Sequence, residues 1–249
     1  YKSIKKIKKN ADLILASNVF AHSDDLKMMG ECILKLLSKK GVAVIEVQYL
    51  LRTLKDLTFD NIYHEHYNYW SLTSLKYFFE KIGGTIFNAE EIDTHGGSLR
   101  IYISKDSTKK INRNVKIIFK KEINFGIKKL STYKKFGKKI IEIKKNVKKN
   151  ISNLKKNSKF LIGYGAPAKA TTALNFFNIS NEIDFIIEDN KLKHNKIVPG
   201  VNIPIYPKKK CSDPNAKIIV LAWNFFEEIK KNNKNLAKSF INIKSLEKD

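Results

Sequence analysis

Short apolar runs of strand length alternate with amphipathic helical segments along the first hundred residues of this chain. The run Ala11–Ser17 (ADLILAS) precedes a segment that opens at Asp24 and Asp25 and repeats apolar residues every three or four positions. A second run, 42–47 (VAVIEV), follows it. Continuous apolar runs of this length are typical of buried strands. The order strand, helix, strand predicts a parallel pair with a right-handed crossover, and therefore an α/β fold.

The next segments predict how this sheet is completed. Residues 39–41 (KKG) follow the first helix, and we expect them to end it, because cations suit a helix carboxyl terminus and glycine adopts the left-handed cap. An amphipathic helix is predicted over 72–82. Two further strands, 85–92 and 98–103, are joined by the short link 95–97 (HGG), so we expect them to pair antiparallel.

The region 111–156 is rich in lysine and repeats apolar residues at steps of three and four. This spacing predicts one long helix or two shorter ones with a single apolar stripe, which suits a connecting or packing helix. A coiled-coil dimer is the alternative, although the stripe is not a strict heptad and Gly126 and Gly137 interrupt it. The stripe consists of Ile123, Ile127, Leu130, Tyr133, Phe136, Ile140, Ile143, Val147, Ile151 and Leu154.

A second α/β segment begins at Lys159. Its pattern of a strand, a glycine turn, a helix and another strand predicts a second parallel unit. The predicted elements are strand 160–162, turn 163–165, helix Ala168–Phe177, strand 184–187, a loop marked by 199–200 and 204–207, strand 217–222 and helix 225–237.

Cysteine content and hydropathy exclude several classes of protein. Cys32 and Cys211 are far apart and form no C-x-x-C pair, so neither a disulfide framework nor a zinc cluster is predicted, and a reducing cytoplasmic setting is expected. No apolar run approaches the length of about 18 residues that a membrane span needs. The chain begins at Tyr1 rather than methionine, and we therefore expect a fragment.

The formal net charge of +24 raises the question of nucleic-acid binding. Only three of the 48 basic residues are arginines, namely Arg52, Arg100 and Arg113. Proteins that read bases and phosphates rely on the planar arginine fork, whereas the lysines here are spread along the chain. We expect no specific nucleic-acid partner.

The richest group of reactive side chains is Tyr63-His64-Glu65-His66, which follows the second strand and its loop. Open α/β sheets place ligands at the carboxyl ends of their strands. Two imidazoles, a carboxylate and a phenol can supply a general base, a group that orients it, and an oxyanion donor. A loop cap or a metal site is the alternative, but the zinc-protease spacing of two histidines is missing. Asn18 and His22 follow the first strand, and His22 should face the same cleft as His66.

The turn Gly163-Tyr164-Gly165 and the helix after it offer a possible anion site. Backbone N–H groups at a helix amino terminus attract anions, and Lys169 adds a point charge. The alternative is a tight turn whose glycines only permit close packing. Thr171, Thr172 and Asn175 add hydrogen-bonding groups on this helix. Glu188 and Asp189, at the end of the next predicted strand, are expected to contact sugar or ribose hydroxyls, and Trp223 and Asn224 follow the third strand at the same edge.

Seven segments stand in a characteristic order. The first half contains ADLILASNVFAHSDDL, GVAVIEVQYL, FDNIYHEHYNYWS and HGGSLRIYI, and the second contains LIGYGAPAKATTALNFF, IIEDNKLKHNKIVPGVNIPI and VLAWNFFEEI. Together they resemble nucleotide-diphospho-sugar carbon-3 methyltransferases, over nearly the whole chain except residues 105–155. The resemblance implies a small N-terminal zinc-binding domain, a class I methyltransferase domain whose sheet ends in an antiparallel hairpin, and a C-terminal α/β domain.

The resemblance also implies a domain organisation. Residues 1–104 would be the later half of the methyltransferase domain, 105–157 a helical connector, and 158–249 a small Rossmann-like domain that binds the nucleotide sugar. The glycine-rich loop and the acidic residue that hold S-adenosylmethionine would precede Ala11. We therefore expect an incomplete class I sheet in an N-terminally truncated chain, with zinc only in the absent domain.

The resemblance assigns roles to individual residues. Tyr63, Glu65 and His66 would be catalytic positions with His22 nearby, and Asn18 and His22 would form the rim of the S-adenosylmethionine pocket. Gly163, Gly165, Lys169, Thr171, Asn175, Glu188, Asp189 and Asn224 would bind the nucleotide sugar. The expected reaction is methylation of the carbon next to the ketone of a 4-keto-deoxysugar. The alternative is a non-catalytic fragment that binds a nucleotide sugar or another polyanion.

Overall fold

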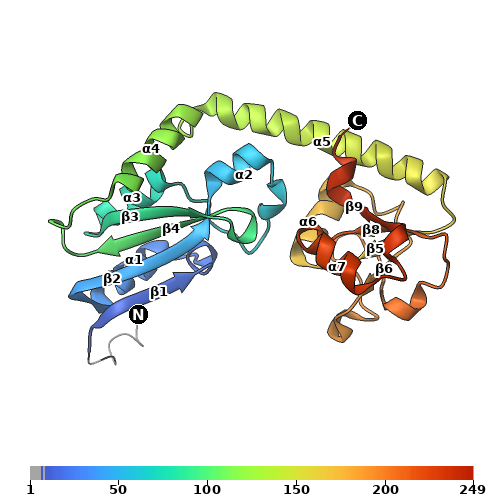
Figure 1. Ribbon diagram of the computed structural model, residues 1–249, viewed down its shortest axis with the longest axis horizontal. Coiled ribbons are helices and arrows are strands. Elements are labelled where there is room, and N and C mark those ends of the chain that lie inside the picture. Colours follow the sequence, from blue (N-terminus) through green and yellow to red (C-terminus); the bar gives the residue numbers. More distant parts are fainter. Residues whose placement is uncertain (1–6, 8, 249) are drawn as a thin grey trace. The chain divides into compact units, whose positions relative to one another are not determined.

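The computed structural model describes residue 7 and residues 9–248, which divide into two compact units (Figure 1). The first unit extends to Phe59 and resumes over His64–Phe136. The second unit contains Asp60–Tyr63 and continues from Gly137. The loop that carries the Tyr63–His66 segment is thus shared between the two units. The domain boundaries drawn from the sequence stay a prediction.

The first unit is built on a four-stranded sheet in the order β1-β2-β4-β3. Its strands are β1 (Ala11–Ser17), β2 (Leu37–Gln48), β3 (Thr85–Ile92) and β4 (Ser98–Ser104). β1 and β2 are parallel, whereas β4 is antiparallel to both β2 and β3. The predicted parallel pair and the predicted antiparallel hairpin are both confirmed, with β4 inserted between β2 and β3.

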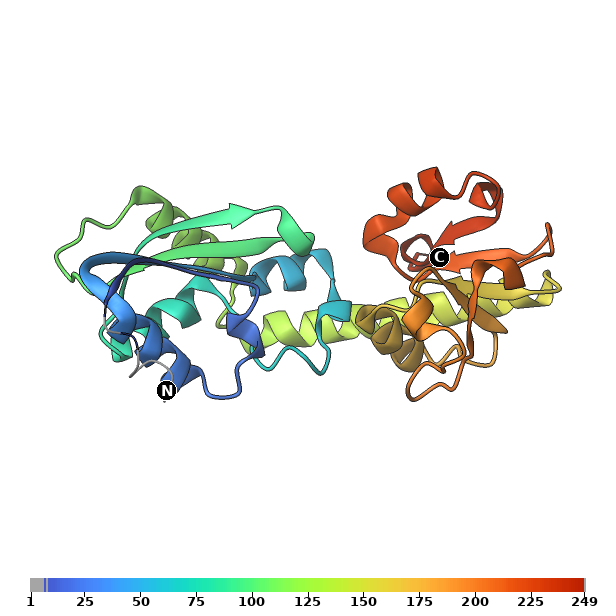
Figure 2. The same cartoon turned by 90° about the horizontal axis from the view of Figure 1, so that it is seen from below.

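Four helices accompany this sheet: α1 (Leu26–Leu36), α2 (Leu50–Asp56), α3 (Leu72–Lys81) and α4 (Arg113–Phe125). Apolar residues of α1, α3 and α4 join one core with alternate residues of the central strands. Ile45 of β2, Ile101 of β4 and Phe79 of α3 are fully buried there. Figure 2 shows α1 and α3 together on one side of the strands.

The predicted end of the first helix is wrong. α1 ends at Leu36 and β2 begins at once with Leu37, so Lys39, Lys40 and Gly41 belong to the strand. Gly41 does not adopt the left-handed conformation; a Cβ atom there would lie 2.8 Å from the carbonyl oxygen of Ala11. The conformation of these residues is therefore determined by pairing with β1, and not by a charge pattern that would suit a helix end.

The lysine-rich region forms two helices, α4 and α5 (Leu130–Lys156). Gly126 ends α4 in the left-handed conformation with φ of +81°. Gly137, in contrast, lies inside α5 and does not interrupt it. The apolar stripe is buried from Ile140 to Ile151, as predicted for a packing helix, but Ile123 and Leu130 are exposed.

The second unit contains a five-stranded sheet in the order β7-β6-β5-β8-β9, and every pairing is parallel. Its strands are β5 (Leu161–Tyr164), β6 (Phe185–Glu188), β7 (Ile205–Pro207), β8 (Lys217–Val220) and β9 (Phe240–Asn242). Its short helices are α6 (Ala168–Phe177) and α7 (Phe226–Asn232). α5 and α6 lie on one side of the sheet and α7 on the other (Figure 2).

Several local predictions for the second unit need correction. Gly163 and Tyr164 belong to β5, so the turn begins only at Gly165. The predicted loop 204–207 contains β7, and β9 was not predicted. These strands have three residues each, which is too short for a readable apolar pattern. The helix predicted over 225–237 is shorter, since α7 ends at Asn232.

The strand order creates a switch point in the second sheet. From β5 the chain proceeds outward through β6 and β7, and then returns to the other side of β5 with β8 and β9. Open α/β sheets bind ligands in the crevice outside the carboxyl ends of the strands at such a point. The α/β fold class is confirmed. Among the described residues, no helix is both long enough and apolar enough to cross a membrane.

Candidate active site and nucleotide site

Two histidines meet at the carboxyl edge of the first sheet. The ring centroids of His22 and His66 are 5.0 Å apart, with an angle of 67° between the ring planes. Backbone contacts connect their segments, because the N–H of Tyr67 donates to the carbonyl oxygen of Ala21 at 3.1 Å. The predicted proximity of His22 and His66 is confirmed.

The sequence after β1 explains the position of His22. Asn18 adopts the left-handed conformation with φ of +56°, which asparagine tolerates better than most residues. Its N–H donates to the carbonyl oxygen of Glu46 at 2.9 Å. Phe20, two residues later, is fully buried beside the rings of Trp70 and Phe79, with centroid distances of 5.6 and 5.7 Å. Buried Phe20 therefore fixes the chain two residues before His22, whose side chain is exposed at the edge of the sheet.

The residues around His66 differ in exposure. His66 is half-buried, and its ring lies 6.3 Å from that of Tyr69, centroid to centroid. The side chains of His64 and Glu65 are 78% and 51% exposed, and Nε2 of His64 lies 3.9 Å from Oε1 of Glu65. The imidazole of His66 is therefore more buried than that of His64. Tyr63 belongs to the second unit, whereas His22, Glu65 and His66 belong to the first.

The two glycines at the end of β5 differ in role. A Cβ atom on Gly163 would lie 2.8 Å from Cγ1 of Ile186 and 2.9 Å from Cδ1 of Leu221, so this glycine permits close packing between strands. Gly165 has φ of +84°, which turns the chain from β5 toward α6. Only Gly165 therefore has the turn conformation that was predicted for both.

Glu188, at the end of β6, closes the loop after Gly165. Its Oε2 accepts from the N–H of Ala166 at 2.8 Å, and its Oε1 accepts from the N–H groups of Asp189 and Asn190. Lys193 donates to the carbonyl oxygen of Ala166 at 2.9 Å. Glu188 thus organises the loop, and its predicted contact with substrate hydroxyls stays a prediction.

Asp189 and Asn175 also contact neighbouring parts of the second unit. The Tyr164 hydroxyl donates to Oδ2 of Asp189 at 2.7 Å. Nζ of Lys208 lies 2.6 Å from Oδ1 of the same aspartate. Burial raises the pKa of Tyr164, which keeps this hydroxyl protonated. The Asn175 amide donates to the carbonyl oxygens of Thr171 and Pro199, at 2.8 and 3.0 Å.

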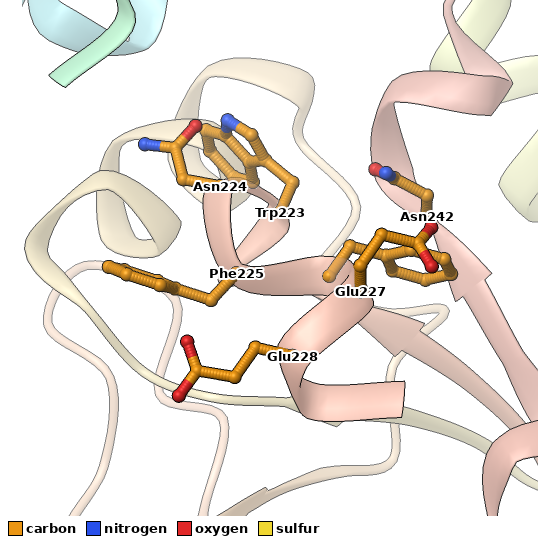
Figure 3. A pocket seen from close by; sticks show the side chains of 7 residues that line it. Trp223, Asn224, Phe225, Glu227, Glu228 and Asn242 are labelled. Carbon is orange, nitrogen blue, oxygen red and sulfur yellow. The ribbon is translucent and has the colours of Figure 1, made fainter. Parts of the chain in front are cut away.

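A pocket of about 390 Å³ lies beside the carboxyl ends of β8 and β9 (Figure 3). It combines aromatic rings, two amides and two carboxylates, which is a suitable lining for a sugar or a base. Its residues are Trp223, Asn224, Phe225, Phe226, Glu227, Glu228 and Asn242. Asn224 was predicted at this edge, whereas Phe225 and Asn242 were not predicted.

Sequence reasoning also missed an ion-pair cluster in the second unit. Asp60 contacts Lys169 and Lys244, from two different segments of the chain. The only signal in the sequence was the position of Asp60 in the same loop as His66. In the described part of the chain, no group of three or more His, Cys, Asp or Glu side chains is arranged to hold a metal ion.

Comparison with known proteins assigns the family. The domain described as the C-methyltransferase C-terminal domain matches residues 93–242, which is more than half of the chain, and a methyltransferase domain matches residues 2–87. The chain belongs to the C-methyltransferase family. The curated C-methyltransferase NovU of Streptomyces niveus is 30% identical over 232 residues, which are 92% of this chain and 55% of NovU. The chain thus spans about half the length of this C-methyltransferase.

Two solved structures are similar to this member of the family over part of its length. The magnesium protoporphyrin IX methyltransferase of Synechocystis PCC 6803, with bound SAH, has 12% identity and a TM-score of 0.31, covering 40% of this chain and 47% of that chain. TnmH has 17% identity and a TM-score of 0.32, covering 41% of this chain and 33% of that chain.

Proposed function

We propose that the protein containing this chain is an S-adenosylmethionine-dependent C-methyltransferase. Its proposed substrate is a nucleotide-diphospho-4-keto-deoxysugar, methylated on the carbon next to the ketone. Family membership supports methylation of carbon. Within the chain, the observation that carries the proposal is the His22–His66 pair, with centroids 5.0 Å apart at the carboxyl edge of the first sheet.

His66 is the proposed general base. A ketone acidifies the neighbouring carbon, so an imidazole can take the proton there and leave an enolate. An unperturbed imidazole has a pKa near 6.5, which suits proton transfer near neutral pH. Tyr63 or His22 would hold the enolate oxygen by donating a hydrogen bond. Glu65, the residue before His66, has a side chain that is 51% exposed, so it is the second candidate for the base.

The described residues fit only the rim of a site for S-adenosylmethionine. Asn18 and His22 follow β1, and the left-handed Asn18 turns the chain at the edge of the sheet where a ligand would lie. No glycine-rich turn follows β1 or β2 among the described residues of the first unit. When bound, the methyl donor supplies a methyl group whose C–S bond breaks as the enolate carbon forms the new C–C bond.

The second unit is proposed to hold the nucleotide diphosphate. Its all-parallel sheet has a switch point between β5 and β8, and Gly165 and Lys169 lie directly beyond β5. Lys169 supplies a positive charge in the first turn of α6. The pocket beside Asn224 would receive an uncharged part of the substrate, because Glu227 and Glu228 repel phosphates.

The experiment that tests the mechanism uses the complete gene product and His66→Ala. We expect turnover to fall by roughly a hundredfold to ten-thousandfold, with substrate affinity nearly unchanged, because a general base acts in the transition state. Solvent deuterium exchange at the carbon to be methylated, measured without the methyl donor, should also disappear. His64→Ala is the matched control, since its side chain is 78% exposed and it should retain exchange.

Three outcomes would contradict this assignment. If exchange survives in His66→Ala but disappears in Glu65→Gln or His22→Ala, the base is a different residue. Methyl transfer to an oxygen would exclude the enolate mechanism. A complete gene product that binds uridine or thymidine diphosphate but neither binds S-adenosylmethionine nor turns over would favour the non-catalytic alternative.

A further inference from the structure

Asp60 is a buried carboxylate at the start of the loop that leads to His66. Its side chain is only 2% exposed. One carboxylate oxygen, Oδ2, lies 3.3 Å from Nζ of Lys169, and the other, Oδ1, lies 3.7 Å from Nζ of Lys244. The Lys169 ammonium also donates a hydrogen bond to the side-chain oxygen of Asn61, which is buried as well. Two lysines from distant segments thus converge on one short piece of the loop.

Both lysines lie at the carboxyl edge of the second sheet. Lys169 is in the first turn of α6, beyond β5, and Lys244 follows β9. Nζ of Lys244 is 5.5 Å from the centroid of the Trp223 ring, which lines the pocket beside β8. Asp60 therefore contacts the cations that stand where this kind of sheet binds its ligand.

Because Asp60 is buried, its carboxylate depends on the two lysines rather than on water. A carboxylate removed from water must be paired, because an uncompensated buried charge is strongly destabilising. Asp60 and Asn61 belong to the second unit, and Tyr63, the first of the proposed catalytic residues, follows two positions after Asn61. Holding Asp60 and Asn61 on Lys169 therefore restricts where Tyr63, in the same unit, can lie.

The same contact reduces the charge available to a ligand. A carboxylate 3.3 Å from the Lys169 ammonium partly neutralises it, and repels phosphate groups that approach the same cation. Lysine has three N–H donors, so it can hold the loop and a phosphate oxygen at the same time. Asp60 therefore opposes nucleotide affinity while it favours placement of Tyr63.

We propose that Asp60 is a positioning residue, which uses Lys169 to place Tyr63 at a cost in affinity for the substrate diphosphate. This inference rests on the proposed function. Asp60→Asn keeps the size of the side chain and removes its charge. In the complete gene product, we expect Asp60→Asn to bind uridine diphosphate and thymidine diphosphate about threefold or more tightly, measured by isothermal titration. We expect kcat to fall about tenfold or more while KM decreases, because Tyr63 is less well placed.

Two further variants separate this role from general destabilisation. Asp184→Asn is the matched control: Asp184 pairs with Lys155 at 2.6 Å and accepts from the N–H of Leu161, at the opposite end of the sheet. It should lower thermal stability and leave both nucleotide affinity and kcat unchanged. Asn61→Ala removes the neutral acceptor of Lys169 and keeps the charge of Asp60, so we expect a lower kcat without tighter binding.

Nucleotide affinity that is unchanged or weaker in Asp60→Asn would overturn the inference, as would an unchanged kcat. If Asp60→Asn does not fold, an Asn61→Ala protein that folds and keeps its full kcat would overturn it as well. The titrations require no turnover. A wild-type protein that forms no C-methylated product would therefore refute the proposed reaction, while the affinity measurement would still test the role of Asp60 at Lys169.

Discussion

Glu122 is a fully buried carboxylate on α4 whose contacts connect α4 to α3. It accepts hydrogen bonds from the N–H groups of Leu72 and Thr73, at 2.6 and 2.9 Å, and from the Thr73 hydroxyl at 2.5 Å. These N–H groups belong to the first turn of α3, which has no acceptors within its own helix. Burial and the nearby Glu122 carboxylate raise the pKa of Tyr49, so that this buried phenol stays protonated.

We expect Glu122→Ala to lower the free energy of unfolding by about 3 kcal/mol, because one buried and two partly buried donors lose their acceptor. Urea denaturation followed by circular dichroism measures this change. Glu142→Ala, at an exposed position of α5, is the control and should change stability by less than about 0.5 kcal/mol. A loss below about 1 kcal/mol in Glu122→Ala would show that water replaces the carboxylate.

Two glycines in the lysine-rich region should respond to substitution in opposite directions. Gly126 lies between α4 and α5 with φ of +81°, and a Cβ atom there would lie 3.1 Å from Thr132 Oγ1. Gly137 is inside α5, and a Cβ atom there would meet nothing within 4 Å. Left-handed backbone is strained for alanine, whereas an open helical position favours alanine over glycine.

We expect Gly126→Ala to lower the free energy of unfolding by about 1 kcal/mol or more, and Gly137→Ala to raise it by roughly 0.5 to 1 kcal/mol. Thermal unfolding of the two variants beside the wild type measures both effects, and each variant is the control for the other. Changes of equal sign would mean that α5 does not run unbroken through residue 137, or that Gly126 does not separate the helices.

At the scale of the whole molecule, the net charge of +24 predicts weak binding to any polyanion. Two of the three arginines already pair with carboxylates: Arg52 pairs with Asp56 at 2.7 Å, and Arg100 pairs with Glu46 at 3.0 Å. The remaining cations are almost all lysines, which bind phosphates without reading sequence.

Duplex DNA binding, if measurable at low salt by fluorescence anisotropy, should therefore disappear near physiological ionic strength and show no sequence preference. Two unrelated duplexes of equal length form the control for sequence. A complex with one duplex that persists at physiological salt would contradict this interpretation of the lysine excess.

Local patterns in the sequence predicted much of the fold and part of the site. The strands Ala11–Ser17 and Thr85–Ile92 and the helix Ala168–Phe177 have the bounds that their apolar spacing indicated. The proximity of His22 and His66 was predictable as well. Each follows one of two neighbouring parallel strands, and the carboxyl ends of parallel strands share one edge of a sheet.

Tertiary contacts decided the features that local patterns could not. Gly41 belongs to β2 because this strand pairs with β1, although Lys39 and Lys40 before it would suit the end of a helix. β7 and β9 are three-residue strands whose conformation depends on pairing with β6 and β8. The buried Asp60 cluster requires Lys169 and Lys244, which come from distant parts of the sequence. Apolar periodicity acts between near neighbours in the chain and is readable there, whereas strand pairing and buried ion pairs depend on partners that only the folded chain brings together.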